Sequence, residues 1–169
     1  QPMYSKDKRY SIVFNGEIYN HLSLRNEILR RKPNHKWRGS SDTETLLACF
    51  EIWGVRDTLS LLIGMFAIAV WDKKNKELVL VRDRLGEKPL YYYKTEDRGL
   101  VYGSTLKSIC KFPGVDDSLN FQGIWDLPTF LWVPQPKTIF SKIESLPRGH
   151  YLSIDNNKTE IVKYNYKLS

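Results

Sequence analysis

The sequence predicts an α+β fold in which antiparallel sheets pack on each other and helices cover them. Two observations favour this class: several segments pair as hairpins, and helical patterns lie between groups of strands. The predicted hairpins join 65–71 with 77–82, 89–94 with 100–103, and 151–154 with 160–164. In the first hairpin the alternation of apolar and polar residues is blurred, which indicates strands buried on both faces.

A strand and a helix are expected at the beginning of the chain. Residues 9–14 have a strand-like pattern that ends at the turn signal Asn15-Gly16. Asn20 is expected to cap a helix that runs to about Arg31, because Asn is a favoured residue at that position.

The remaining helices are predicted from capping and stop signals. Ser41 and Glu44 form a capping box ahead of an apolar run, and this helix is expected to stop at Gly54. Further helical segments are predicted at 57–62, 105–110 and 120–132, the last broken by Pro128. The 169 residues are 41% hydrophobic, which suits one globular domain.

Charge and cysteine usage exclude several classes of partner. The net charge of +7 comes from scattered Lys and Arg residues, without a helix-turn-helix, zinc-finger or RNA-recognition pattern, so we expect no nucleic-acid partner. No apolar run reaches the length of a membrane span, so no membrane partner is expected. Cys49 and Cys110 are far apart, form no metal-ligand pair and favour a reducing, cytoplasmic setting. No metal site is predicted.

The segment Asn15-Gly16-Glu17, followed after one helix by Asp42, carries the most chemical information. An amide side chain beside a glycine N–H can hold a developing oxyanion, and two carboxylates beyond them can hold an ammonium group. Each residue also has a structural explanation: Asn-Gly is a strong hairpin-turn signal, and acidic residues stabilise helix starts. The residues by themselves leave both interpretations open. Lys88 is expected to be an ordinary surface lysine.

Five segments together carry a resemblance to a known family: Asn15–His21, Gly39–Glu44, Gly64–Ala69, Arg82–Tyr91 and Pro134–His150. They resemble the glutaminase domain of glutamine-dependent asparagine synthetase, a class II glutamine amidotransferase of the N-terminal-nucleophile hydrolase type. The resemblance runs in order along almost the whole chain. It implies a four-layer αββα sandwich of antiparallel sheets, and we expect the first strand of one sheet to be missing.

The resemblance also implies a site and a mechanism. Asn15 and Gly16 are the expected catalytic residues, as the oxyanion hole, and Glu17 and Asp42 are expected to bind the α-ammonium group of glutamine. The attacking group in the family is the thiolate of an N-terminal cysteine, whose own amino group acts as the base. We expect this cysteine, and an arginine for the glutamine carboxylate, upstream of Gln1. The chain as printed is therefore expected to be inactive.

By the same resemblance, residues 1–169 form a single, incomplete glutamine amidotransferase type 2 domain. A synthetase domain is expected after Ser169, where ammonia and ATP convert aspartate to asparagine; related enzymes that amidate other acceptors fit the same segments. Glutamine and that synthetase domain are the expected partners, and a homodimer is compatible with the family. No cofactor is expected in this domain, whereas the synthetase domain requires ATP and Mg²⁺. The alternative is a non-catalytic module that binds glutamine or a partner.

Overall fold

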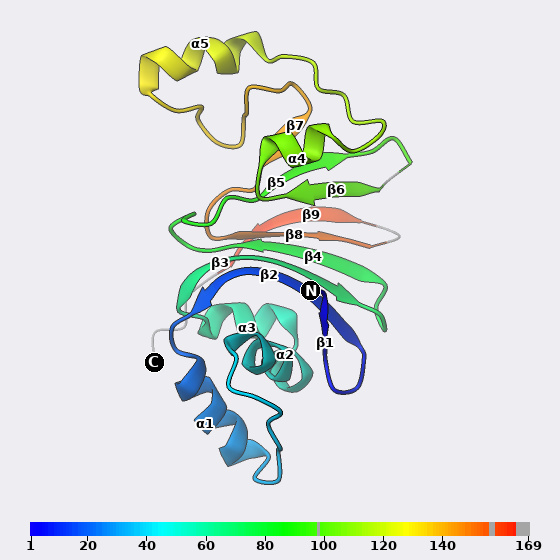
Figure 1. Ribbon diagram of the computed structural model, residues 1–169, viewed down its shortest axis with the longest axis vertical. Helices are drawn as coiled ribbons and strands as arrows, with labels where there is room; N and C mark the ends of the chain where they lie inside the picture. Colours follow the sequence, from blue (N-terminus) through cyan, green and yellow to red (C-terminus); the bar gives the residue numbers. More distant parts are fainter. Residues whose placement is uncertain (98, 156–157, 165–169) are drawn as a thin grey trace.

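The computed structural model describes residues 1–97, 99–155 and 158–164. It contains a six-stranded and a three-stranded sheet, both antiparallel, stacked between two groups of helices (Figure 1). This arrangement confirms the predicted αββα layering. The predicted single domain extends to residue 169, and its last five residues lie outside the described part, as do residue 98 of the predicted turn at 96–99 and residues 156–157 of the turn at 155–158.

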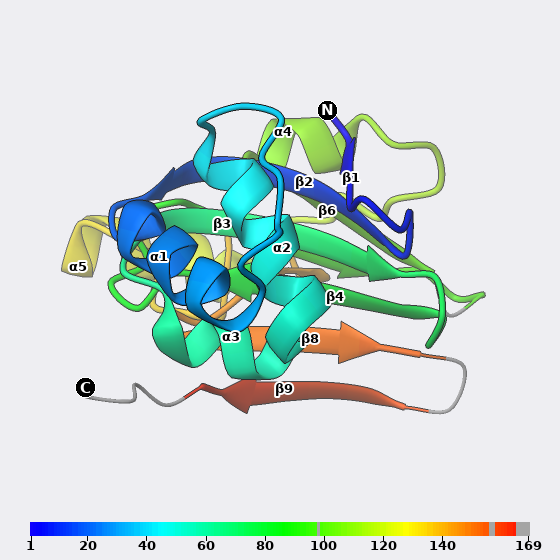
Figure 2. The ribbon, with the colours of Figure 1, turned by 90° about the horizontal axis from the view of Figure 1, so that it is seen from below.

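The large sheet has the strand order β1-β2-β3-β4-β8-β9, and its strands are Met3–Tyr4, Tyr10–Ile18, Gly64–Asp72, Glu77–Arg82, His150–Ile154 and Thr159–Lys163. The small sheet has the order β6-β5-β7, with strands Leu100–Gly103, Tyr91–Lys94 and Ile143–Ser145. The helices are α1 (His21–Arg31), α2 (Asp42–Trp53), α3 (Val55–Leu61), α4 (Leu106–Cys110) and α5 (Phe121–Phe130). Helices α1, α2 and α3 lie across one face of the large sheet (Figure 2).

Each boundary between layers contains its own apolar cluster. Strand β3 illustrates the principle, because Ile68 packs toward the helices while its neighbours Ala67 and Ala69 pack toward the small sheet. Both faces of this strand are therefore buried, which is the physical reason for its blurred alternation. On the far side of the small sheet, Ile109 of α4 packs with Tyr93 of β5 in a smaller apolar cluster.

Three local predictions are wrong, two of them because a more distant contact overrides a local signal. Strand β2 does not turn at Asn15-Gly16 but continues to Ile18, in register with β3 along its whole length. The Asn20 side chain does not cap α1; its amide bridges the Leu61 carbonyl at 2.9 Å and the Ile63 N–H at 3.0 Å.

The third wrong prediction concerns Pro128, which was expected to break its helix but lies inside the last turn of α5. The capping box of α2 is half confirmed. Ser41 Oγ accepts the Glu44 N–H, whereas the Glu44 carboxylate accepts the N–H groups of Arg38 and Gly39. Strand β7 escaped prediction because three residues are too few for a periodic pattern.

The outer edge of β2 is only partly covered. Strand β1 pairs with it at two residues, and further along the Gln1 side-chain amide replaces a strand by bonding the Phe14 carbonyl at 2.6 Å and the Phe14 N–H at 2.8 Å. No described strand pairs with this edge between Asn15 and Ile18. This open stretch is where the candidate site lies.

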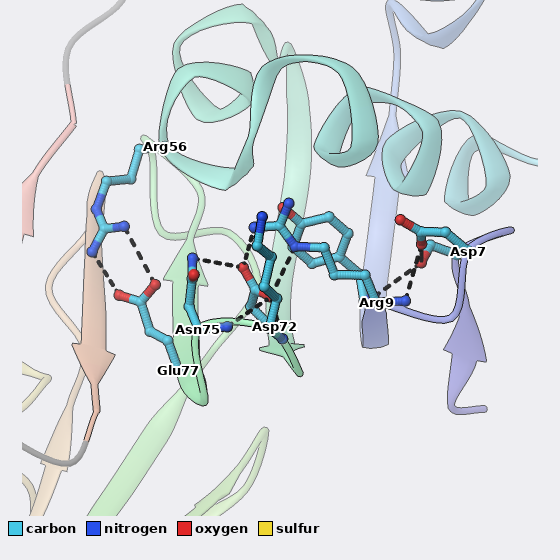
Figure 3. A network of polar contacts seen from close by, with 9 residues as sticks. Asp7, Arg9, Arg56, Asp72, Asn75 and Glu77 are labelled. Atoms are coloured by element: carbon cyan, nitrogen blue, oxygen red, sulfur yellow. Dashed lines mark hydrogen bonds and ion pairs between the residues drawn. The ribbon is translucent and has the colours of Figure 1, made fainter.

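A polar network closes the opposite end of the large sheet (Figure 3). Asp72, whose side chain is 4% exposed, accepts two hydrogen bonds from the Arg9 guanidinium at 2.9 and 2.7 Å. The same carboxylate accepts the N–H groups of Lys74 and Asn75, which form the β3–β4 turn. One buried carboxylate thus joins β2 to the β3–β4 hairpin.

Replacing Asp72 by asparagine is expected to lower the unfolding free energy at neutral pH by about 2 kcal/mol, because Arg9 loses its ionic partner. Burial opposes ionisation of Asp72, but the bonds from Arg9, Asn75 and Lys74 outweigh it and hold the pKa below its usual 3.8. Asp72 therefore stabilises the fold fully above about pH 4, and this contribution is lost as the pH falls through the folded-state pKa.

Urea titrations between pH 2 and pH 7 test this expectation. The Asp72→Asn variant should show a shallower loss of stability below pH 4 than the parent chain, whereas Asp57→Asn, at an exposed position in α3, should follow the parent curve. Parallel curves for the parent and Asp72→Asn would contradict it.

Candidate functional site

A cavity of about 420 Å³ opens at the uncovered end of β2. It is formed by the end of β2, the starts of α1, α2 and β3, and the loop after β4, through Asn15, Gly16, Glu17, His21, Asp42, Met65 and Lys88. The four residues predicted as site residues thus line one cavity, although Asp42 lies far from the others in sequence. His21 and Lys88, which were not predicted as site residues, line it as well.

The backbone of β2 directs a donor toward this cavity. The Phe14 N–H bonds Gln1 Oε1 at the outer edge, and the Ile18 N–H bonds Asp42 Oδ2 at 3.0 Å. Alternate residues of a strand direct their N–H groups to the same edge, so the Gly16 N–H also points outward. Asn15 is exposed beside it, and its Nδ2 donates to Ser104 Oγ at 3.3 Å. Two neutral donors therefore stand side by side.

Gly16 holds a backbone conformation that excludes other residues. Its φ is +148°, and a Cβ atom there would lie 2.1 Å from the Met65 carbonyl oxygen and 2.7 Å from Phe66 Cα. Only glycine lets β2 and β3 approach so closely at this point. The need for glycine arises from strand packing as well as from the site.

The acidic side of the cavity has one fixed and one exposed carboxylate. Asp42 occupies the first turn of α2, where it accepts the Thr43 N–H at 2.8 Å in addition to the Ile18 N–H. These bonds orient the half-buried carboxylate, while Glu17 lines the same cavity from the end of β2. Two carboxylates around one space can bind a cationic group such as an ammonium.

The loop after β4 is built on two buried charged residues. Asp83, 1% exposed, accepts the N–H groups of Leu85, Glu87 and Lys88 at 2.9–3.0 Å and of Phe66 at 3.3 Å. The adjacent Arg82 guanidinium donates to the carbonyls of Gly86, Lys88 and Leu146 and to Ser145 Oγ. Both residues therefore shape the loop, and the loop in turn brings Lys88 to the cavity.

Almost the whole chain is similar in sequence to known proteins. A sequence model of the glutamine amidotransferase domain matches residues 1–166. The chain belongs to this family. It is 35% identical to asparagine synthetase [glutamine-hydrolyzing] 3 of Bacillus subtilis over 160 residues, covering 94% of this chain and 25% of that protein. It is 31% identical to asparagine synthetase [glutamine-hydrolyzing] 2 of the same organism over 168 residues, 95% of this chain and 21% of that one.

Solved structures agree on the fold of this amidotransferase domain. Glutamine phosphoribosylpyrophosphate amidotransferase from B. subtilis, complexed with ADP and GMP, superposes with a TM-score of 0.64 at 18% identity, over 99% of this chain and 32% of that one. An allosteric regulatory enzyme of purine biosynthesis gives a TM-score of 0.68 at 17% identity with the same coverage. The amidotransferase domain itself spans about a quarter or less of the curated synthetases that it matches.

Neither cysteine of the amidotransferase domain lines the cavity. Cys49 is buried in α2, and burial raises the pKa of its thiol to about 12. Cys110 is half-buried, and burial together with the charge of Asp117 raises the pKa of that thiol too. Both thiols are therefore protonated at neutral pH and poor nucleophiles.

The described residues contain neither a metal-binding cluster nor a membrane-spanning helix. No group of three or more His, Cys, Asp or Glu side chains in the described ranges is arranged to hold a metal ion. Across the same part of the chain, no helix has the length and apolar character needed to cross a membrane.

Proposed function

We propose that this domain binds glutamine in the cavity beside β2 and releases the side-chain nitrogen as ammonia within a longer, asparagine synthetase-like protein. The observation that carries the proposal is the convergence of Asn15, Gly16, Glu17 and Asp42 on one cavity, in a member of the glutamine amidotransferase family. The three side chains and the Gly16 N–H match the two ends of glutamine. Its carboxamide needs donors, and its ammonium group needs carboxylates.

In the proposed reaction a cysteine thiolate attacks the carboxamide carbon of glutamine. The carbonyl electron pair moves to oxygen, and the Gly16 N–H and Asn15 Nδ2 stabilise the resulting negative charge. The amino group of that cysteine, which has taken the thiol proton, gives it to the amide nitrogen, so the carbon–nitrogen bond breaks and ammonia leaves. Water then cleaves the thioester to give glutamate and the free thiol. Because Cys49 and Cys110 are remote and protonated, the proposal assigns the nucleophile to an N-terminal cysteine outside the printed residues, as in the family. Loss of one oxyanion donor is expected to lower kcat by roughly 10²–10³.

The fate of the ammonia forms the second part of the proposal. We infer that a synthetase domain of the same protein uses it, with ATP and Mg²⁺, to amidate aspartate in the cytoplasm. The names and greater lengths of the curated relatives support this part. None of the described residues is assigned to ATP or Mg²⁺.

The charge of Asp42 provides the direct test. Asp42→Asn keeps an oxygen for the Ile18 N–H but removes the negative charge, so glutamine binding should weaken about tenfold or more while the fold is retained. Titration of the isotopically labelled 169-residue chain with L-glutamine, followed by NMR, measures this even for affinities in the range of roughly 1 mM. Asp57→Asn, an exposed acid on α3, is the matched control.

Two outcomes would contradict the proposal: the protein with its natural upstream residues shows no shifts of cavity residues with L-glutamine, or Asp42→Asn binds as tightly as the parent. Specific glutamine binding without glutamine hydrolysis, in a natural protein whose sequence upstream of this domain lacks the cysteine, would instead favour the non-catalytic binding module.

A further inference from the structure

Lys88 is the cationic side chain of the cavity that the family-based site does not include. It is half-buried, and no ion pair or hydrogen bond of its ammonium group is found within the described residues. Its backbone, in contrast, is held on both sides. The Lys88 N–H donates to Asp83 Oδ2 at 2.9 Å, and its carbonyl accepts Arg82 Nε at 3.0 Å. The fold therefore fixes the backbone of Lys88, while its ammonium group has no ion-pair partner among the described residues.

The anchoring contacts place Lys88 at the Gly16 end of the cavity. Asp83 Oδ2, which accepts the Lys88 N–H, also accepts the Phe66 N–H at 3.3 Å, and the Asp83 N–H donates to the Phe66 carbonyl at 2.8 Å. Phe66 lies directly opposite Gly16 in the β2–β3 register. Asp42 contacts β2 at Ile18 instead, two residues beyond Gly16. The Lys88 backbone is thus tied to the residue opposite Gly16, and Lys88 lines the same cavity as the amide donors.

The neighbouring charges leave Lys88 available for a ligand. Glu17 and Asp42 line the same cavity, yet neither forms an ion pair with Lys88 within 4.0 Å. Asp83 already accepts four backbone N–H groups. His21, the other basic side chain of the cavity, stands at the start of α1.

We infer that Lys88 stabilises negative charge on the ligand oxygen that faces the Gly16 N–H, acting as a cationic supplement to the two neutral donors. This inference rests on the proposed function. In the thiolate addition, the carbon–sulfur bond forms while the carbonyl pair moves to oxygen; Lys88 keeps its proton and contributes through its charge. A positioned cation in a partly desolvated cavity strengthens the binding of an oxyanion more than that of a neutral amide.

A comparison of the affinities for glutamine and for its product glutamate distinguishes this role from ordinary substrate binding. The two ligands share the amino and carboxylate groups and differ only at the γ-carbon, where glutamate carries a full negative charge. Lys88→Met keeps the length of the side chain and removes its charge. It should weaken L-glutamate binding to the 169-residue chain about tenfold and change L-glutamine binding less than threefold. Lys88→Arg should keep the glutamate affinity near that of the parent.

The measurement is a pair of NMR titrations, one with each ligand, on the parent, Lys88→Met, Lys88→Gln and Lys88→Arg chains. Lys73→Met, at an exposed position beyond β3, is the matched control and should bind both ligands as the parent does. The amide spectra report the fold of each variant, and Lys88→Gln replaces Lys88→Met if the latter unfolds. Higher salt should reduce the glutamate affinity of the parent more than that of the two neutral variants, because salt screens the Lys88 charge in addition to the carboxylate–ammonium contacts that all the chains share.

The inference is tested by how the ratio of the L-glutamate affinity to the L-glutamine affinity changes between the parent and the Lys88 variants. Equal weakening of both ligands, or no change in either, overturns it, because Lys88 would then contribute only shape or nothing. Failure of both the parent chain and the protein with its natural upstream residues to bind either ligand overturns the proposed function itself, and this inference with it. Selective loss of glutamate affinity, restored by arginine, supports it.

Discussion

Gly16→Ala is expected to destabilise the domain by about 4 kcal/mol and to abolish ligand binding in the cavity. The new methyl group would lie 2.1 Å from the Met65 carbonyl oxygen, on a backbone whose φ is +148°. Overpacking and a disfavoured backbone conformation each cost about 1–3 kcal/mol, and neither the β2–β3 ladder nor the cavity wall can shift without breaking strand hydrogen bonds. The same glycine supplies the outward-pointing N–H, so stability and binding should fall together.

Gly114→Ala separates the two contributions. Gly114 has a φ of +83°, but no atom lies within 4 Å of its hypothetical Cβ. This control should lose only about 1 kcal/mol, the cost of the backbone conformation alone. Urea unfolding of both variants gives the comparison. Similar losses for the two glycines would show that the approach of β3 to β2 is softer than the structure indicates.

Asp83→Ala should have an effect of similar size for a different reason. The substitution removes one buried carboxylate and leaves four backbone N–H groups without their acceptor. Each buried unsatisfied group costs about 1–3 kcal/mol, and water entering the exposed loop recovers part of this, so we expect a loss of about 4 kcal/mol. Since the Lys88 backbone is anchored here, glutamate binding should also weaken more than glutamine binding.

Hydrogen exchange makes this prediction specific. The amides of Phe66, Leu85, Glu87 and Lys88 should lose protection in Asp83→Ala before the rest of the domain does, because in the described part of the chain these are the N–H groups that bond the deleted carboxylate. Asp57→Ala, on the surface of α3, should leave all four amides as protected as in the parent chain. Uniform exchange across the large sheet in Asp83→Ala would argue against a local clamp.

Local sequence signals predicted the elements whose cause is local. The β3–β4 hairpin has apolar strands flanking a polar turn, and the Ser41 cap satisfies an N–H only three residues away. The turn signal at Asn15-Gly16 and the capping signal at Asn20 gave wrong predictions, because these signals are local whereas the actual partners of these residues are distant in the sequence. Pairing of β2 with β3 extends past the glycine, and the Asn20 amide bridges the end of α3 to β3 instead of capping its own helix.

The sequence by itself determined the family, the fold class and the four residues first assigned to the site, because these depend on ordered motifs and on apolar periodicity. Only the tertiary structure decided that Asn15, Gly16, Glu17 and Asp42 line one cavity and that Lys88 joins them. The reason is physical. Lys88 reaches the cavity through the Asp83 carboxylate, which ties its N–H to a strand residue opposite Gly16, and no local pattern of residues encodes such a long-range hydrogen bond.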